Sequence, residues 1–369
     1  LVATTQVAFQ GSDQLGISPL RPGNPLLSPE TGEEWEAGVD LSFLNDRIGL
    51  LAPYYNQKTY NSVVTRDLPP SIGFPNEQFT NVGQIDNRGF EVELDALALD
   101  MDDFTWDWRF VVSNNRNEIS ELVDPIIFGL GTNSQRHQQG LPFATYANPR
   151  VIMDTDGPRV LTCDETPNSW GPDDEPGDWE DFCDPIDNAR YGGQPTPQWY
   201  GSAQTTINLF KYVQLYALFN FNSGFQLFNS TSEFLCGFLG GGPGGGTCSD
   251  IFESTSGGFA TSDSGELTDE AQIKAFAAGI QSADPWYDTG NFAKLATVQL
   301  RFDMPPSVLR FLKMSGMSIQ FIGENLASWS GYGGLDPEIN NSGQTEASRA
   351  EFLTLPPTRR FIGTINLFF

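Results

Sequence analysis

Two neighbouring segments in which apolar and polar residues alternate strictly constrain the fold of this chain most. The apolar positions are Phe90, Val92, Leu94, Ala96 and Ala98 in the first segment and Phe104, Trp106, Trp108, Phe110 and Val112 in the second. The positions between them are largely charged and include Glu91, Glu93, Asp95, Asp107 and Arg109. A period of two residues is that of a β-strand with one buried face, and the polar turn at residues 100–103 joins the segments into a β-hairpin.

Each segment is about as long as a tilted membrane crossing of roughly 9–11 residues. A soluble β-sandwich would turn its apolar face inward against a second sheet, whereas a membrane barrel turns that face toward lipid and keeps charged residues in a wet lumen. In the barrel interpretation, the lipid-facing residues are Phe90, Val92, Leu94, Phe104, Trp106, Trp108, Phe110, Phe219, Phe221, Phe302, Phe361 and Phe369. The lumen-facing residues are Glu91, Glu93, Asp95, Asp107 and Arg109.

Similar segments recur along the chain and are separated by connections of two very different lengths. The predicted strands, about ten in all, lie near residues 1–9, 33–43, 48–59, 90–98, 104–112, 203–209, 213–221, 296–302, 317–321 and 361–369. Short connections at Asn45, Asp100, Phe210 and Pro305 alternate with long loops, and the largest loops cover residues 114–197, 229–288 and 324–357. This asymmetry predicts an all-β, antiparallel transmembrane β-barrel with short periplasmic turns and long extracellular loops.

Two local signals add detail to this plan. Pro53 lies inside a predicted strand and removes one backbone donor, which predicts a β-bulge there. Residues 11–29 are rich in turn formers and are expected to be irregular. Residues 268–278 combine a threonine cap, early acidic residues and apolar spacing, which predict one short helix within the second large loop.

Composition narrows the classes of function. The chain has 369 residues, a net charge of -27 and no run of about 18 apolar residues, so we expect no membrane-spanning helix and no binding to nucleic acid. A solvated surface explains the negative charge better than a specific cation-binding role. The sequence starts at Leu1 without a signal peptide, which we interpret as a mature or incomplete segment.

Several of these segments also resemble a known family. The segment NPLLSPETGEEWEAGVDLSFLNDRIGLLAPYYNQKT at residues 24–59 and the motif at residues 81–92 resemble a hairpin and a strand of TonB-dependent outer-membrane receptors of the SusC/RagA type. Residues 193–211, 295–305, 323–326 and 332–337 resemble later strands of that family, and LPPTRRFIGTINLFF resembles its C-terminus. The matches occur in order over nearly the whole chain.

The resemblance implies the C-terminal part of a barrel that imports large nutrients, typically glycans or peptides, across the outer membrane of a Gram-negative bacterium. It also implies a SusD-like surface lipoprotein as a partner and energy relayed by TonB–ExbB–ExbD through an N-terminal part with a plug domain, which this sequence does not contain. Full barrels of this kind have about 22 strands. We therefore expect the strand at residues 361–369 to pair with a strand outside this sequence, and not with residues 1–9.

Catalytic signals are weak, and we predict that the chain is not an enzyme. It has one histidine, His137, and the glycine run at residues 240–246 lacks the lysine and hydroxyl residue of a phosphate-binding loop. Two alternatives to transport stay open. One is a structural or adhesive outer-membrane barrel that joins neighbours through its loops, and the other is a secreted all-β carbohydrate-active protein with tryptophan platforms and a carboxylate pair.

The four cysteines fall into two local pairs within the predicted loops, Cys163 with Cys183 and Cys236 with Cys248. Four thiols could form a structural zinc site, but neither pair has the short CxxC spacing. The acidic and glycine-rich surroundings favour exposed loops in an oxidising compartment. We therefore predict two disulfides within the loops.

A candidate calcium site lies next to the first cysteine. Its residues are Asp154, Asp156, Asp164 and Glu165. The segment begins as D-x-D-G, and Glu165 is close to the position that supplies the last ligand of a twelve-residue calcium loop. An acidic, solvated loop is the alternative, because Pro158 and Val160 fit that loop poorly. Apart from this calcium ion, no cofactor is predicted.

Overall fold

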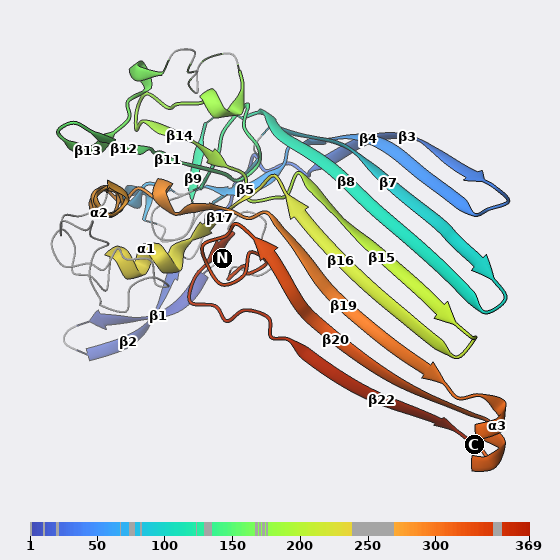
Figure 1. The fold of residues 1–369 in the computed structure, drawn as a ribbon. Coiled ribbons are helices and arrows are strands. Elements are labelled where there is room, and N and C mark those ends of the chain that lie inside the picture. The colour runs from blue at the N-terminus through green and yellow to red at the C-terminus, as the bar shows by residue number, and fades with distance from the viewer. Residues whose placement is uncertain are drawn as a thin grey trace.

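The computed structural model describes residues 2–9, 12–19, 22–66, 68–73, 78–81, 83–122, 124–128, 135–166, 169, 171, 174, 176–237, 269–341 and 349–369. Its main feature is an antiparallel sheet of nine strands in the order β22-β20-β19-β16-β15-β8-β7-β4-β3 (Figure 1). The strands are β3 Thr31–Phe43, β4 Ile48–Tyr60, β7 Gln84–Met101, β8 Phe104–Glu121, β15 Trp199–Leu209, β16 Val213–Ser223, β19 Phe292–Asp303, β20 Gly316–Ser330 and β22 Arg360–Phe368. Chain neighbours are also sheet neighbours, as in an up-and-down barrel wall.

The N-terminal hairpin is separate from this sheet. Strand β1 (Val2–Phe9) was predicted and is present, but it pairs with β2 (Ser12–Pro19), in a region for which the sequence predicted only turns. The other nine predicted strands all lie in the large sheet. In the part of the chain that is described, β22 pairs only with β20 and β3 only with β4, so the sheet is open and β1 does not close it.

The two lengths of connection are as predicted. At one end of the sheet the links are short, at residues 44–47, 102–103 and 210–212. The backbone N–H of Tyr212 donates to the carbonyl oxygen of Leu209 and closes a β-turn. Its two central residues, Phe210 and Lys211, have positive φ angles of 50° and 64°, as the favoured turn between twisted strands requires. The link expected as a simple turn at Pro305 instead contains a short helix, α3 Pro306–Leu312, with proline in its first turn.

Pro53 does not cause the predicted bulge. The register between β3 and β4 runs without a shift, and Pro53 lies directly opposite Gly38. A Cβ atom at Gly38 would lie 2.8 Å from the Cα of Pro53, so glycine provides the space that the proline needs. A bulge occurs instead between Leu97 and Leu99 of β7. The strict alternation predicted through Ala98 is therefore wrong at its last position, where Leu99 lies opposite Trp106.

The long connections fold together at the other end of the sheet, and we call the described parts of residues 122–198, 224–291 and 331–359 the loop unit (Figure 1). Its strands are β9 Ile126–Phe128, β10 Gln135–His137, β11 Thr145–Pro149, β12 Val151–Asp154, β13 Gly157–Val160, β14 Ala189–Gly193, β17 Gln226–Asn229, β18 Tyr287–Thr289 and β21 Ala350–Glu351. Its helices are α1 Ser230–Gly237 and α2 Asp269–Ile280, and α2 confirms the predicted helix. Strands β5 Val63–Arg66 and β6 Gln78–Asn81 form a further hairpin.

The main hydrophobic core lies within the loop unit and not on the large sheet. Its buried members are Tyr146, Val151, Phe228, Ala277, Ala283, Trp286 and Ala350. They come from all three long loops, and a parallel pairing of β17 with β21 links the second loop to the third. No helix among the described residues is long and apolar enough to cross a membrane.

Candidate functional site

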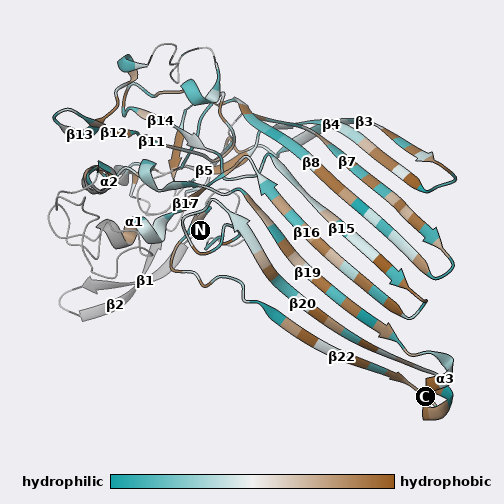
Figure 2. Cartoon of the chain, viewed as in Figure 1, coloured by the Kyte–Doolittle hydropathy of each residue, from teal (hydrophilic) through white to brown (hydrophobic). Residues whose placement is uncertain are grey.

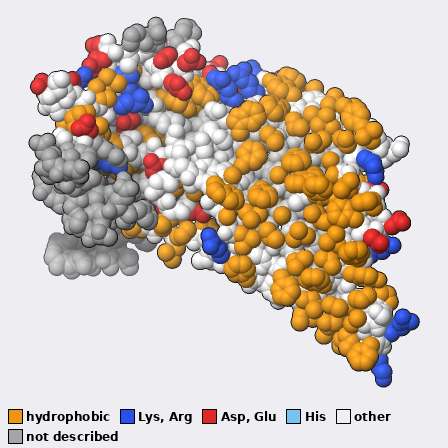
Figure 3. Space-filling model, viewed as in Figure 1, with side chains coloured by type: hydrophobic (Ala, Val, Ile, Leu, Met, Phe, Trp, Pro, Cys, Tyr) orange, Lys and Arg blue, Asp and Glu red, His pale blue; other side chains and the backbone are white. Residues whose placement is uncertain are grey.

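The large sheet has one apolar face, which remains exposed. Cross-strand partners share a face, so the pairs Leu94 with Phe110 and Phe110 with Ala203 extend this face from strand to strand. The register and the alternation place on it Phe90, Val92, Leu94, Phe104, Trp106, Trp108, Phe110, Phe219, Phe221, Phe302 and Phe361. Phe369 follows the end of β22 and is also exposed. Figures 2 and 3 show the hydrophobic residues spread over the strands.

A row of aromatic rings strengthens this face along β8. Trp106 and Trp108 have ring centroids 5.6 Å apart, and Trp108 stacks on Phe110 at 5.3 Å with an interplanar angle of 5°. The indole Nε1 of Trp106 donates to Thr205 Oγ1 at 2.8 Å, so its one polar group is satisfied within the sheet. An indole without such a partner would be costly in an apolar solvent.

The opposite face of the same strands is polar. It carries all five residues predicted to face the lumen, Glu91, Glu93, Asp95, Asp107 and Arg109. Arg109 lies opposite Asp95 in the register and contacts both neighbouring carboxylates, with its Nε 2.7 Å from Asp95 and its Nη2 2.6 Å from Glu93. These side chains are about half exposed, so water screens the ion pairs and their contribution to stability is small.

Hydrogen bonds between side chains continue this polar face on the adjacent strands. Tyr216 donates to Gln204 at 3.0 Å, Gln214 donates to Asn208 at 3.0 Å, and Asn208 donates to Thr105 on β8 at 2.9 Å. Near the short turns, this face contains a hollow of about 430 Å³. It is lined by both charged and polar groups, including Asp46, Arg47, Asp95, Asp107, Arg109 and Gln204.

A buried lysine connects the polar face to the loop unit. Lys294 on β19 is 4% exposed, and its Nζ lies 3.0 Å from Asp336 and also contacts Glu338. Both carboxylates belong to the third loop, so the ion pairs fix that loop over the end of the sheet. Sequence reasoning missed this contact, because 42 residues separate Lys294 from Asp336 and no local pattern joins them.

The loop unit contains a polar cavity of about 360 Å³ between its first and second loops. The cavity is lined by Arg150, Glu180, Tyr191, Gly192, Gly193, Gln226, Asp284 and Tyr287. Arg150 lies 3.5 Å from Asp284, and burial raises the pKa of Asp284 although the guanidinium of Arg150 opposes that shift. Burial also raises the pKa of Tyr191 well above its ordinary value. The cavity therefore offers hydroxyl groups and charges of both signs to a polar ligand.

His137, the histidine of the first loop, has a structural role. It lies between Phe128 and Phe143, with ring centroids 4.5 Å and 4.2 Å away, and its Nδ1 accepts a hydrogen bond from the backbone N–H of Ala144. Burial lowers the pKa of His137 to about 4. The neighbouring Arg136 is 2% exposed and pairs with Asp184 at 3.0 Å, so both residues stabilise the loop unit from inside.

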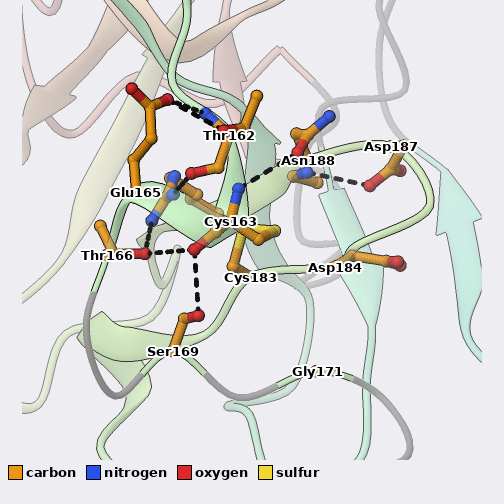
Figure 4. The surroundings of a disulfide bond; sticks show 12 residues. Thr162, Cys163, Glu165, Thr166, Ser169, Gly171, Cys183, Asp184, Asp187 and Asn188 are labelled. Carbon is orange, nitrogen blue, oxygen red and sulfur yellow. Dashed lines mark hydrogen bonds between the residues drawn. A yellow bond between two sulfur atoms is a disulfide. The ribbon is translucent and has the colours of Figure 1, made fainter.

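One of the two predicted disulfides is present. Cys163 is bonded to Cys183, with Cα atoms 5.6 Å apart (Figure 4). The backbone N–H of Cys163 donates to Asn188 at 3.2 Å, and Arg190 donates to the carbonyl oxygen of Thr162 at 2.8 Å. The bond therefore holds the segment around residue 163 against β14. The second predicted pair, Cys236 with Cys248, lies outside the residues whose side chains are described.

The structure gives no support to the candidate calcium site. The guanidinium of Arg159 occupies the space between two of the expected ligands, with its Nε 2.6 Å from Asp154 and its Nη2 2.6 Å from Glu165. Asp156 and Asp164 do not join them, and no group of three or more metal-binding side chains occurs in the described part of the chain. An arginine thus provides the positive charge that the sequence suggested for a cation.

The model of the β-barrel of TonB-dependent receptor-like proteins matches residues 4–232, more than half of the chain. The chain belongs to this family. Its members are β-barrel transporters and receptors of the Gram-negative outer membrane and not enzymes. The resemblance noted in the sequence is therefore confirmed.

Individual relatives agree with this assignment. TonB-dependent receptor P26 of Formosa agariphila is 23% identical over 366 residues, which cover 93% of this chain and 34% of that protein. TonB-dependent receptor SusC of Bacteroides thetaiotaomicron is 29% identical over 146 residues, which cover 36% of this chain and 15% of that protein. The chain thus spans about a third of the length of the curated relatives that match nearly all of it.

Solved structures show the same fold. A structure of the RagAB peptide transporter superposes with a TM-score of 0.73 at 18% identity and covers 100% of this chain and 38% of that chain. The RagAB peptide importer in its open-open state gives a TM-score of 0.67. At this low identity, the likeness supports the architecture of an antiparallel barrel wall with large loops.

Proposed function

We propose that this chain forms part of the wall and the external loops of an outer-membrane transporter that imports a large nutrient, such as a glycan or a peptide. The apolar face of the sheet contacts lipid, the polar face lines the lumen, and the loop unit lies outside the cell. The transporter moves the nutrient through the lumen without breaking any bond of the substrate.

The difference between the two faces of one sheet is the observation that carries this proposal. Phe110, Phe219, Phe321 and Phe361 are 37%, 40%, 55% and 77% exposed on the apolar face. A soluble protein rarely exposes so large an apolar surface, which argues against a secreted carbohydrate-active protein. The hydrogen-bonded polar face would be costly in hydrocarbon but is suited to water.

The loop unit supports a role in substrate contact. It is a packed structure with its own core, a disulfide and buried ion pairs, so it can present a fixed surface to a ligand. The polar cavity between its first and second loops is a candidate contact for sugar hydroxyls or peptide groups. We also propose a SusD-like surface lipoprotein and the TonB–ExbB–ExbD system as partners, by analogy with the family.

Accessibility along β16 tests the orientation of the sheet. Single spin labels would be placed at residues 214 to 219 of the protein in its outer membrane, and their collision rates with oxygen and with a water-soluble nickel chelate would be measured. Leu215, Ala217 and Phe219 should favour oxygen, whereas Gln214, Tyr216 and Leu218 should favour the chelate, because oxygen concentrates in hydrocarbon. An alternation of the opposite phase would refute the proposed orientation.

Transport itself needs a genetic test. A strain that lacks the gene and a strain that lacks TonB would be grown on single polysaccharides and on peptide mixtures as the sole carbon source. The proposal predicts that at least one substrate fails to support growth of both strains while simple sugars still do. Normal growth of the gene-deletion strain on all substrates, with loss of contacts between cells, would instead favour a structural or adhesive barrel.

A further inference from the structure

A hollow in the apolar face lies where β19, β20 and β22 meet. Its volume is about 410 Å³, within the range of small-molecule sites. The lining is almost wholly apolar and includes Val298, Leu300, Phe321, Leu326 and Phe361 together with Gly323 and Gly363. Phe321 lies opposite Gly363, and Phe361 lies opposite Gly323. The two rings therefore stand at diagonal corners. The space above Gly363 is open, whereas the side chains of Leu326 and Phe361 lie over Gly323.

The backbone conformation and the packing at Gly363 do not require a glycine. Glycine inside a strand weakens it and usually marks a bulge, a tight bend or the close approach of another molecule. The register between β20 and β22 has no shift, and Gly363 is not among the glycines with positive φ. A Cβ atom at this position would meet nothing within 4 Å. Gly363 therefore leaves open space on the apolar face that another molecule can occupy.

A cationic residue lies just before β22, the strand that forms one side of the hollow. Arg359 and Arg360 precede Phe361, and Arg360 lies opposite Glu324, with Nε 2.7 Å from its carboxylate on the polar side. Arg359 directly precedes the strand, which begins at Arg360, and is two residues from Phe361. Arg359 is exposed, and no carboxylate among the described residues forms an ion pair with it. The adjacent backbone is fixed, because Asn325 donates to the carbonyl oxygen of Thr358 at 3.3 Å.

The height of the strand places Arg359 at the margin of the membrane. Eight residue steps separate Phe361 from Phe369, which is about 26 Å along a strand and about 20 Å of height at the usual tilt. That height takes up most of the roughly 25 Å apolar band of an outer-membrane barrel. Arg359 lies just beyond this band at the end where the long loops are, which is the outer side in the proposed orientation.

We propose that this hollow binds one phosphorylated lipid of the outer leaflet. One acyl chain lies over Gly363 between the two phenylalanine rings, and Arg359 binds a phosphate of the headgroup. Arginine is well suited to this role because its planar guanidinium can donate two parallel hydrogen bonds to phosphate oxygens. The proposal rests on the proposed function only in requiring that the apolar face contacts lipid.

Native mass spectrometry of the protein extracted from its outer membrane tests the site. The delipidated protein would be titrated with lipid A and with lipid A whose phosphates have been removed. Wild-type protein should retain one copy of lipid A above the non-specific background. Gly363→Leu fills the hollow without a clash and should weaken retention of both lipids by about tenfold or more. Thr364→Leu is the matched control, because it adds volume to the same strand on the opposite face, and it should bind as wild type.

The second variant separates the phosphate from the acyl chain. Arg359→Gln should lower retention of lipid A by about tenfold, to the level of the dephosphorylated form, and should leave retention of the dephosphorylated form unchanged. The proposal would be overturned if wild type, Gly363→Leu and Thr364→Leu bound lipid A equally. It would also be overturned if a protein partner occupied the hollow in place of the lipid, or if the Arg359→Gln variant still preferred the phosphorylated form. If the spin labels show lipid contact but these variants bind normally, only the lipid site fails.

Discussion

Replacing Phe219 by arginine would place a cation on the apolar face near its mid-height. Strand β16 begins at Val213, next to a short turn, and Phe219 is six residues further along. This corresponds to about 20 Å along the strand and, because the strand is tilted, about 15 Å of height in the membrane. The apolar band is about 25 Å tall, so this position is close to its centre. Phe219 is 40% exposed in the chain, and the charge would therefore contact lipid directly.

The expected cost follows from the depth of the charge. Arginine or lysine on the lipid face costs about 2–4 kcal/mol at the midplane and about 0–1 kcal/mol near the interfaces. The adjacent Leu218 provides a matched control on the polar face, where it lies opposite Gln204 and Thr297. An arginine there can donate hydrogen bonds to its neighbours and to water. We therefore expect Leu218→Arg to cost less than about 1 kcal/mol.

The assay compares the two variants in the same bilayer. Unfolding by urea from phosphatidylcholine vesicles would be followed by tryptophan fluorescence and by the mobility shift of the folded barrel in an unheated gel. Phe219→Arg should lower the free energy of unfolding by at least about 2 kcal/mol more than Leu218→Arg. Equal losses, or a larger loss from Leu218→Arg, would contradict the assignment of the two faces.

Three further predictions concern single features of the fold. Gly38→Ala should weaken pairing of β3 with β4, seen as faster amide exchange, because its Cβ would lie 2.8 Å from the Cα of Pro53, whereas Gly32→Ala has open space and should not. Burial lowers the pKa of His137 to about 4, so the free energy of unfolding of the loop unit should fall by about 3 kcal/mol as the pH falls from about 6.5 to 4. Proteolysis at different pH values would measure this loss, and a His137→Gln variant that keeps the same pH dependence would refute it. Reducing Cys163–Cys183, which closes a loop of 20 residues, should cost the loop unit up to about 3 kcal/mol and expose it to protease while the folded barrel keeps its gel mobility; loss of that mobility would contradict it.

The alternation of residue types was sufficient to predict the faces and most of the register. A slip of one residue would move every side chain of a strand to the opposite face. A strand with charged residues on one face and apolar residues on the other therefore permits one register only. The predicted positions on β7 and β8 share faces as expected for this reason. The bulge between Leu97 and Leu99 was missed because residues 96–99 are four consecutive apolar residues, which leave the phase of the alternation undefined there.

The loop unit was less predictable because its contacts join distant residues. Tyr146, Phe228 and Trp286 form one core although each lies in a segment that reads as a polar loop. The Lys294 ion pairs, the cavity beside Arg150 and the pairing of β17 with β21 have the same origin. The local signals that did succeed there were the spacing of Cys163 and Cys183 and the helix pattern of α2.

The free edge of β22 leads to a last prediction. In an antiparallel strand every second residue directs its backbone N–H and C=O away from the bonded neighbour, so roughly four residues of β22 present unpaired groups at this edge. Each unsatisfied group costs several kcal/mol in hydrocarbon, and their sum exceeds the net stability of about 5–15 kcal/mol of a typical protein. We therefore expect β22 to pair, in the membrane, with a strand outside the nine-stranded sheet. A photoreactive amino acid at Ile362 should crosslink to a peptide from beyond this sequence, and a crosslink to β1 would show instead that the barrel closes on itself.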